Sequence, residues 1–315
     1  MAAVSAAPVI RADLSEAHPR PSGAATEGEA HEVETDRHGM PIHPGKTLGE
    51  PVVVLKDVRK AYLLDGGASV DVLKGISLSL DTDPRDGTPS EFYPIREGEF
   101  VLLRGASGQG KTTLCNCIGA IDSVTGGSIE LFGEVLDAKA ADSERTLADL
   151  RLRKIGWVFQ SFQLLGALSA FENVELPMSV LGELSKQERT ARAKMLLAMV
   201  GLEDRISHLP SELSGGEQQR VAIARSLANA PRLMLLDEAV ADLDTRNQVA
   251  VMNLLLRINL ERKVTMIMVT HDPHLECYAD RILYIRDGRI EAQQINAKQT
   301  PLDAEAHAAF LAAEG

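Results

Sequence analysis

Cysteine is scarce in this sequence, where Cys115, Cys117 and Cys277 are the only three among 315 residues. Three cysteines cannot build a disulfide framework, and their scarcity indicates a reducing compartment. Cys115 and Cys117 could in principle bind a metal, but two residues apart on a helix they face different directions. We therefore expect both to be small core residues.

Long apolar runs are also absent, because no stretch approaches the roughly 18 to 20 consecutive apolar residues of a membrane helix. The first residues, MAAVSAAPVIRADL, lack the charged start and the apolar segment of a secretory signal. Acidic residues at positions 13, 16, 27 and 29 disfavour a transit peptide. We expect a chain that is soluble by itself.

Basic residues are in deficit, with 33 Lys and Arg against 45 Asp and Glu and a net charge of -12. A general nucleic-acid binder needs a basic face, so that class is disfavoured, although a local basic patch is compatible with an acidic total. No internal repeat is present. Hydrophobic residues at 44% and charged residues at 25% are ordinary for a globular protein.

The first 50 residues differ in composition from the rest of the chain. Residues 1–50 are rich in Ala, Pro, Gly, Glu and His and have no apolar periodicity. Such a segment buries too little surface to offset its conformational entropy, so we predict a disordered tail. The folded domain is predicted to span residues 51–315, and residues 81–94 are polar and turn-forming, an apparent loop insertion between strands.

Strand and helix patterns alternate along the predicted domain. Strands are expected at 52–62, 70–80, 100–103, 126–133, 155–159, 233–236 and 264–269, with a hairpin at 281–292 that turns at Asp287-Gly288. From about 137 to 228 the spacing is mostly helical, and the last 20 residues are helical too. The runs 233–236 and 264–269 do not alternate, which indicates burial on both faces of a parallel α/β sheet.

The stretch VLLRGASGQGKTT, residues 101–113, carries the first chemical signal. Gly105 to Thr112 fits the pattern G-x-x-x-x-G-K-[ST], with an apolar strand before it and a helix after it. Glycines let the backbone fold closely around a polyphosphate, so that N–H groups point at negative charge. Lys111 can reach the β and γ phosphates, and the Thr112 hydroxyl can bind Mg²⁺. A glycine-rich turn with a chance lysine is the alternative, and the two flanks disfavour it.

Two further stretches place charge near such a loop. LSGGEQQR, residues 213–220, opens a helix with a serine and two glycines, which is either an ordinary cap or an anion-binding arrangement. Asp237 and Glu238 follow a buried strand, where one acid can hold Mg²⁺ and the other can activate water. Otherwise they are simply acids at a helix N-terminus. The next strand delivers His271 to the same edge of the sheet.

These stretches together resemble the ATP-binding subunits of ABC transporters. The resemblance covers roughly residues 52–292, and every diagnostic element stands in the expected order. It implies a P-loop NTPase core with a mostly parallel sheet, an antiparallel β subdomain and an inserted helical subdomain at about 137–228. Residues 162–177 and 114–122 are similar to the lipoprotein-release and macrolide-export branch.

The resemblance also implies roles for individual residues. Those expected to bind nucleotide are Tyr62, which would stack on adenine unless it is a core tyrosine, Gly105, Ala106, Ser107, Gly108, Gln109, Gly110, Lys111, Thr112, Thr113, Ser214, Gly215, Gly216 and Asp244. The expected Mg²⁺ ligands are Thr112, Gln160 and Asp237. The expected catalytic residues are Glu238, His271, Gln160 and Lys111.

One segment departs from the family pattern. After the catalytic pair the family usually has Pro-Thr and then Ser-Ala-Leu-Asp, whereas this chain has Ala239-Val240 and then Ala241-Asp242-Leu243-Asp244. In the family this segment lies across the dimer interface. The departure therefore affects the coupling between the two ATP sites of such a dimer more than the chemistry at each site.

The resemblance implies a head-to-tail dimer, of two identical copies or with a second ABC ATPase, which sandwiches ATP and Mg²⁺ and drives a polytopic membrane permease. The chain would then be cytoplasmic and held at a membrane by that permease, with no nucleic acid expected. Two other classes stay open. One is a non-transport ABC ATPase acting on ribosomes or DNA, and the other is a module that binds ATP without cycling. Within transport, a division-type complex that passes a mechanical signal is the alternative.

Overall fold

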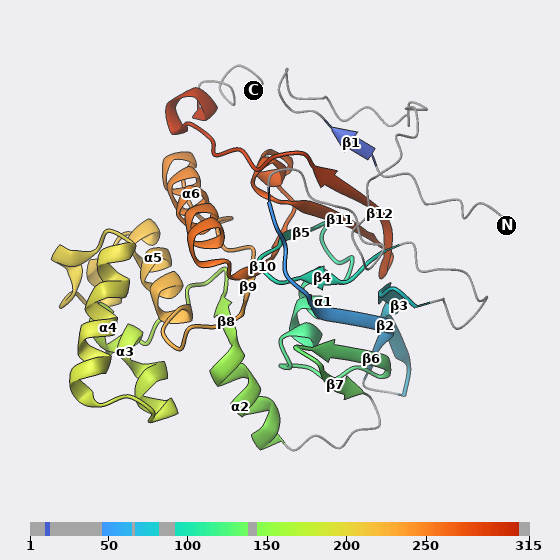
Figure 1. Cartoon of the computed structure of the whole chain (residues 1–315), viewed down its shortest axis with the longest axis horizontal. Coiled ribbons are helices and arrows are strands. Elements are labelled where there is room, and N and C mark those ends of the chain that lie inside the picture. The colour runs from blue at the N-terminus through green and yellow to red at the C-terminus, as the bar shows by residue number, and fades with distance from the viewer. Residues whose placement is uncertain (1–9, 13–45, 65–66, 82–91, 138–143, 309–315) are drawn as a thin grey trace, which may run out of the picture. The chain divides into compact units, whose positions relative to one another are not determined.

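The computed structural model describes residues 10–12, 46–64, 67–81, 92–137 and 144–308 (Figure 1). The chain forms two compact units. The first consists of Met1–Ile118, Ser123–Ala140 and His271–Thr300, and the second of Gly119–Asp122, Ala141–Thr270 and Pro301–Gly315. Most of the predicted tail and of the 81–94 insertion lies outside the described residues.

The first unit contains an antiparallel sheet. Its strands run in the order β3 (Ser69–Leu78), β2 (Pro51–Leu63), β6 (Gly126–Leu131) and β7 (Glu134–Asp137), with β4 (Ile95–Arg96) also paired to β2. The long strand β2 alternates buried and exposed residues, as a sheet with one face on the core requires. The sequence patterns predicted β2, β3 and β6 but not the short strands β4 and β7.

The same unit contains the strand that leads into the phosphate loop. β5 (Phe100–Arg104) pairs in parallel with β11 (Arg281–Arg286), which pairs antiparallel with β12 (Arg289–Asn296). The predicted hairpin turn is confirmed, because Asp287 and Gly288 both have the positive φ angles, 48° and 72°, that a tight hairpin needs. α1 (Lys111–Ile118) follows β5, and the predicted core positions of Cys115 and Cys117 on it are confirmed at 0% and 2% exposure.

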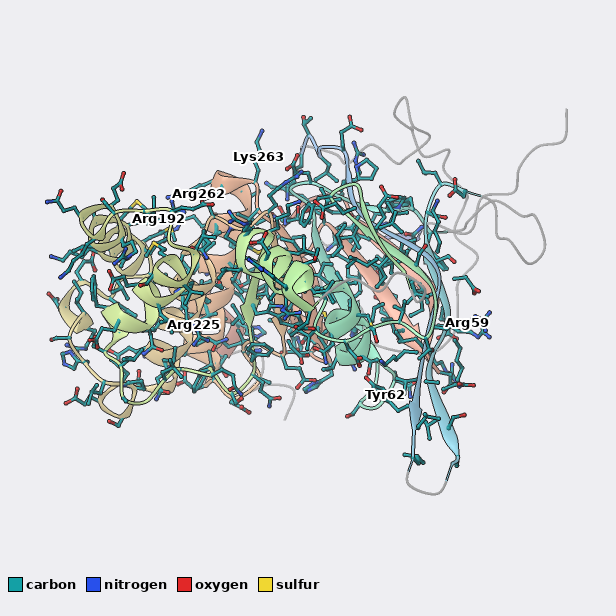
Figure 2. The ribbon with its side chains drawn as sticks, turned by 90° about the horizontal axis from the view of Figure 1, so that it is seen from below. Arg59, Tyr62, Arg192, Arg225, Arg262 and Lys263 are labelled. Carbon is teal, nitrogen blue, oxygen red and sulfur yellow. The ribbon has the colours of Figure 1, made fainter. Side chains whose placement is uncertain are left out.

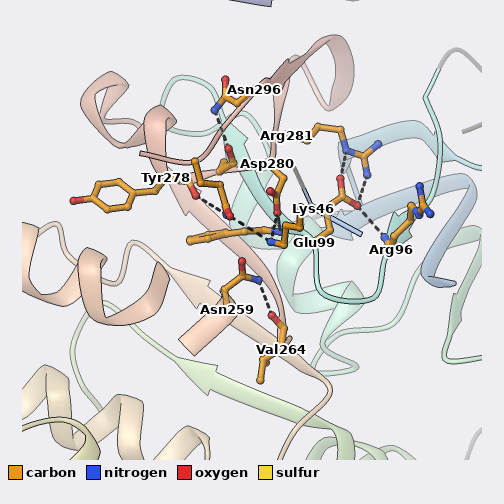
Figure 3. Close-up of polar contacts among 12 residues, drawn as sticks. Lys46, Arg96, Glu99, Asn259, Val264, Tyr278, Asp280, Arg281 and Asn296 are labelled. Atoms are coloured by element: carbon orange, nitrogen blue, oxygen red, sulfur yellow. Dashed lines mark hydrogen bonds and ion pairs between the residues drawn. The ribbon is translucent and has the colours of Figure 1, made fainter. Parts of the chain in front are cut away.

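The first unit contains a buried ion pair between Arg281 and Glu99. Arg281 and Glu99 are 1% and 3% exposed at their side chains and lie 2.7 Å apart (Figure 3). The guanidinium carbon of Arg281 also lies 4.0 Å from the centre of the Tyr93 ring. Nearby, Lys46 Nζ bonds to the buried carboxylate of Asp280 at 2.7 Å. Lys46 therefore belongs to the folded part of the chain. β1 (Ile10–Ala12) also pairs with β12, so these described pieces of the first 50 residues differ from the predicted disorder.

The second unit is built on three parallel strands. β9 (Leu233–Asp237) lies between β8 (Ile155–Val158) and β10 (Thr265–Thr270), and every residue of β10 is buried. This confirms the expectation that unalternated apolar runs form central parallel strands. α6 (Thr245–Arg262) connects β9 to β10 and buries one apolar face, as a parallel crossover requires.

Helices make up the rest of the second unit. They are α2 (Glu144–Lys154), α3 (Ala170–Leu181), α4 (Lys186–Met199), α5 (Gly215–Ser226) and the 3₁₀ turns Glu203–Arg205 and Pro210–Glu212. α3, α4 and α5 contact one another, and α3 and α4 lie side by side in Figure 1. The helical pattern predicted for about 137–228 is thus present, interrupted by β8 as expected, and its action as a separate subdomain stays a prediction. In the first unit a last 3₁₀ turn spans Pro273–Tyr278, and residues 304–308 of the second unit are helical.

Candidate functional site: a phosphate loop and its partners

The phosphate loop is closed by its own lysine. Lys111 is the first residue of α1 and is 5% exposed, and its Nζ donates to the carbonyl oxygens of Gly105 and Ala106 at 2.8 Å each. The ammonium group therefore lies across the loop that begins where β5 ends. Its positive charge lies at the amino end of α1, beside the first N–H groups of that helix. Such a combination of positive charge and N–H groups favours binding of a polyphosphate.

Two glycines of the loop are required by close packing. A Cβ on Gly105, where φ is +155°, would lie 2.2 Å from the carbonyl oxygen of Ile285. A Cβ on Gly110, where φ is +93°, would meet Leu73 at 3.0 Å and the Val72 carbonyl at 3.1 Å. Gly108 is different, because its φ of +78° demands glycine but nothing lies within 4 Å. The open side at Gly108 leaves backbone accessible for an anion, so the loop fits a nucleotide phosphate.

Tyr62 lies near the end of β2, on the hairpin that β2 forms with β3 (Figure 2). Its side chain is 38% exposed, so it is not the core tyrosine that the sequence left open. Lys60 Nζ lies 4.9 Å from the centre of the Tyr62 ring and donates to the Ser123 carbonyl at 2.6 Å. The lysine thus contacts the ring of Tyr62, and the stacking of this ring on a base stays a prediction.

In the second unit, the acidic pair stands at the end of the central strand. Asp237 is the last residue of β9 and is paired with Val269 of β10. Glu238 follows with a φ of 48°, and its backbone N–H donates to the Val269 carbonyl at 3.1 Å. A left-handed non-glycine residue costs about 1–2 kcal/mol, and such strain concentrates at functional sites. Both carboxylates are half-buried.

Gln160 comes two residues after β8 and contacts the loop that follows Glu238. Its Nε2 donates to Asp242 Oδ1 at 3.2 Å. The backbone beyond it turns through two left-handed residues, Phe162 and Gln163, whose carbonyls accept from Arg225 of α5. Burial lowers the pKa of Arg225, which is labelled in Figure 2. The sequence patterns identified Gln160 but gave no sign of Asp242 or Arg225 as its neighbours.

The glycine-serine stretch caps α5. Ser214 Oγ accepts from the Glu217 N–H at 3.3 Å, and the Ser214 N–H donates to the Glu217 carboxylate at 2.8 Å. The Ser214 hydroxyl also donates to that carboxylate at 2.8 Å, and the two bonds from Ser214 to the carboxylate lower the pKa of Glu217 to about 2. Gly216 must be glycine, because a Cβ there would lie 2.4 Å from the Asn247 side chain. Ser214 and Gly215 are exposed, so the amino end of this helix is open to solvent.

Asp244 caps the next helix, α6. Its carboxylate accepts from the backbone N–H and the side-chain amide of Asn247 at 3.0 and 2.6 Å, and these bonds lower the pKa of Asp244. Since Asn247 also lies against Gly216, the two helix starts are adjacent.

The predicted site residues divide between the two units. Tyr62, residues 105–113 and His271, the first residue after β10, belong to the first unit, and Gln160, residues 214–216, Asp237, Glu238 and Asp244 belong to the second. Within the described ranges no three His, Cys, Asp or Glu side chains gather as a ready metal site. The expected binding of Mg²⁺ by Thr112, Gln160 and Asp237 stays a prediction.

A strand, a glycine loop closed by a lysine and a following helix define a P-loop nucleotide-binding protein. Comparison with known proteins gives the family. The family model described as "ABC transporter" matches residues 93–241. ABC transporter H family member 2 of Dictyostelium discoideum is 49% identical over 240 residues, which are 76% of this chain and 43% of that protein.

Two bacterial relatives match a similar share of the chain. The uncharacterized ABC transporter ATP-binding protein YknY of Bacillus subtilis is 42% identical, across 76% of this chain and 95% of its own length. The macrolide export ATP-binding/permease protein MacB of Syntrophobacter fumaroxidans is 43% identical, across 77% of this chain but 31% of its own length. The chain thus spans nearly all of one relative and less than half of the others.

Among solved structures, the chain is similar to the ATP-binding cassette MJ0796, seen as a dimer in a post-hydrolysis state bound to ADP and Pi. The TM-score is 0.66 and the sequence identity 38%, and the match covers 77% of this chain and 98% of that one. The chain therefore belongs to the ABC transporter family. Within that family it is an ATP-binding, ATP-hydrolysing subunit that resembles the macrolide-export type. Among the described residues, no helix has the length and apolar character needed to cross a membrane.

Proposed function

We propose that this chain hydrolyses Mg-ATP as one half of a head-to-tail dimer and so powers a separate membrane permease. The observation that carries the proposal is the phosphate loop, in which Lys111 is held by the loop's own carbonyls at 2.8 Å. Such a preorganised cation needs little rearrangement when phosphate charge arrives. The exposed, capped start of α5 supports the second half of the proposal.

The phosphates are bound by the loop in this proposal. The N–H groups at the start of α1 and the Lys111 ammonium offset the charge of the β and γ phosphates, and Tyr62 receives the base. Thr112, Gln160 and Asp237 would hold Mg²⁺, which would neutralise charge on the transferring phosphoryl group.

Water activation falls to Glu238. Glu238 is half-buried, and its backbone is left-handed, with a φ of 48°. Glu238 orients the attacking water and accepts its proton, while His271 contacts the γ-phosphate. Ser214, Gly215 and Gly216 of the partner subunit offer a further helix start to that phosphate, so each site is complete only in the dimer.

The permease surface is proposed on α3. Leu176 and Val180 are 36% and 64% exposed and stand four residues apart, so they share one face of the helix, and Leu165 just before α3 is 48% exposed. An apolar strip at helical spacing suits a groove that receives a short helix of a partner. The MacB relative is named as an ATP-binding/permease protein, and the match covers 31% of it.

The test uses Glu238→Gln, which keeps size and hydrogen bonding but removes the base. With Mg-ATP this variant should form a persistent dimer that hydrolyses ATP at least about 100-fold more slowly than wild type. Tagged Glu238→Gln should then retain a polytopic membrane protein from a detergent extract. Wild-type turnover would refute the role of Glu238. Recovery of ribosomal or DNA-repair proteins without a permease would instead favour the non-transport class.

A further inference from the structure

We propose that Asp242 is a positioning residue that orients the side-chain amide of Gln160 for binding Mg²⁺. The inference rests on the proposed function, because it assigns a new residue to the metal half of the same site. It concerns the segment where the chain departs from the family pattern.

The direction of the hydrogen bond carries the argument. An ionised carboxylate can only accept, so the atom that Gln160 presents to Asp242 at 3.2 Å must be its NH₂ group. The amide oxygen, Oε1, is then the atom left for other partners. Oxygen is the only atom of an amide that Mg²⁺ binds. Asp242 therefore selects the one amide orientation that is useful to a metal.

Asp242 is delivered by a segment that is itself held in place. Residues 238–243 form two consecutive turns, in which the Ala241 N–H donates to the Glu238 carbonyl at 3.1 Å and the Leu243 N–H to the Val240 carbonyl at 3.2 Å. Ala239 and Val240 are 2% and 3% exposed, and the Ala239 carbonyl accepts from the buried Gln219 amide. The turn hydrogen bonds and the burial of Ala239 and Val240 thus hold the backbone that carries the exposed Asp242.

Gln160 is held from its other side as well. Arg225 donates through Nη2 to the Phe162 carbonyl at 3.0 Å and through Nη1 to the Gln163 carbonyl at 2.5 Å. The segment carrying Gln160 therefore has its backbone fixed by α5 and its side chain fixed by Asp242. Two such restraints lower the entropy that Gln160 loses when it binds a metal.

The family pattern explains why this contact is particular to the chain. The usual residue at the position of Asp242 is alanine, which has no group to orient a glutamine amide. Asp242→Ala therefore restores the usual residue, and the exposed position of Asp242 indicates that the variant folds.

The experiment measures the affinity of a fluorescent methylanthraniloyl ATP with Mg²⁺ and with EDTA. We compare wild type, Asp242→Ala, Gln160→Ala and the double variant, with Asp204→Ala, another exposed acid of the second unit, as the control for lost charge. Asp242→Ala should weaken binding about 3- to 10-fold in Mg²⁺ and leave it unchanged in EDTA. The double variant should bind no more weakly than Gln160→Ala, and Asp242→Asn, which keeps one acceptor oxygen, should recover part of the loss.

Three results would overturn the inference, namely no effect of Asp242→Ala, an equal effect in EDTA, or a loss that adds to that of Gln160→Ala. The proposed function fails separately, if wild type does not bind the nucleotide at all. A wild type whose Mg²⁺ dependence is lost in Gln160→Ala but kept in Asp242→Ala would leave the function standing and remove only the role of Asp242.

Discussion

Gln109 of the phosphate loop accepts a hydrogen bond from the backbone N–H of Asp287, in the turn between β11 and β12, 178 residues further along the chain. The same turn is held against β3, because the Lys74 N–H donates to the Gly288 carbonyl at 2.9 Å. The loop is therefore supported by a distant hairpin as well as by its own lysine. A restraint on the loop before phosphate arrives reduces the entropy lost on binding.

Removing this support should weaken nucleotide binding more than folding. We expect Gln109→Ala to lower the affinity for ATP about 3- to 10-fold, because one hydrogen bond of about 1 kcal/mol or slightly more is lost from the preorganised loop. Gln109→Glu keeps the acceptor and is the control. Isothermal titration with thermal unfolding checks the prediction, and a loss of melting temperature without a loss of affinity would contradict it.

Two glycines of the loop should differ in their tolerance of alanine. Gly105→Ala places a Cβ 2.2 Å from the Ile285 carbonyl oxygen, a backbone atom that cannot move aside, whereas Gly108→Ala meets nothing within 4 Å. We expect Gly105→Ala to destabilise the protein by more than about 2 kcal/mol and Gly108→Ala by about 1 kcal/mol, the cost of a strained φ alone. Urea unfolding of the two variants measures the difference, and equal losses would show that packing at Gly105 is not the cause.

Ser214 and Ser185 form a matched pair of helix caps. Each Oγ accepts from a backbone N–H three residues on at 3.3 Å, and each N–H donates to the glutamate there at 2.8 Å. Ser214→Ala and Ser185→Ala should therefore lower stability alike, by about 1 kcal/mol. Only Ser214→Ala should reduce ATPase activity and ATP-dependent dimerisation. Equal ATPase activity in the two variants would remove Ser214 from the proposed site.

The cap of α5 also predicts a dependence of stability on pH. The pKa of Glu217 falls from 4.5 to about 2 because the Ser214 N–H and hydroxyl bond to its carboxylate. A depressed folded pKa stabilises the protein above the unfolded value, so this contribution is complete above about pH 4.5 and is lost as the pH falls toward about 2. The melting temperatures of wild type and Glu217→Gln should thus differ at pH 7, and the difference should shrink as the pH falls from about 4.5 toward about 2. A difference that stays constant would refute the carboxylate's role.

The buried pair of Arg281 and Glu99 gives a test of the first unit. Arg281→Met leaves the 3%-exposed Glu99 side chain without the guanidinium 2.7 Å away, and we expect a loss of about 3–5 kcal/mol. Adding Glu99→Leu should recover part of that loss, because the double variant buries no lone charge. Chemical denaturation of the two variants decides this. A double variant less stable than Arg281→Met would show that the unpaired Glu99 carboxylate is not the cause of the loss.

Much of the site was predictable from local sequence. The phosphate loop, the capped start of α5 and the acids after β9 each depend on a short run of residues whose backbone needs are visible in the sequence, such as glycines at positive φ in the loop. The central strands were predictable for the same reason, since apolar runs without alternation are typical of strands buried on both faces of a parallel sheet. The short strands β4 and β7 were missed because two and four residues carry little pattern.

The sequence by itself determined the motifs of this protein: the glycine-lysine pattern of the phosphate loop, the acids that follow the central strand, and the family that these motifs define. Only the tertiary structure decided which residues support them. Gln109 meets Asp287 across 178 residues, and Gln160 meets Asp242 across 82. Such contacts depend on strand register and on the packing of loops over a finished sheet, and neither quantity is a property of a short stretch of chain.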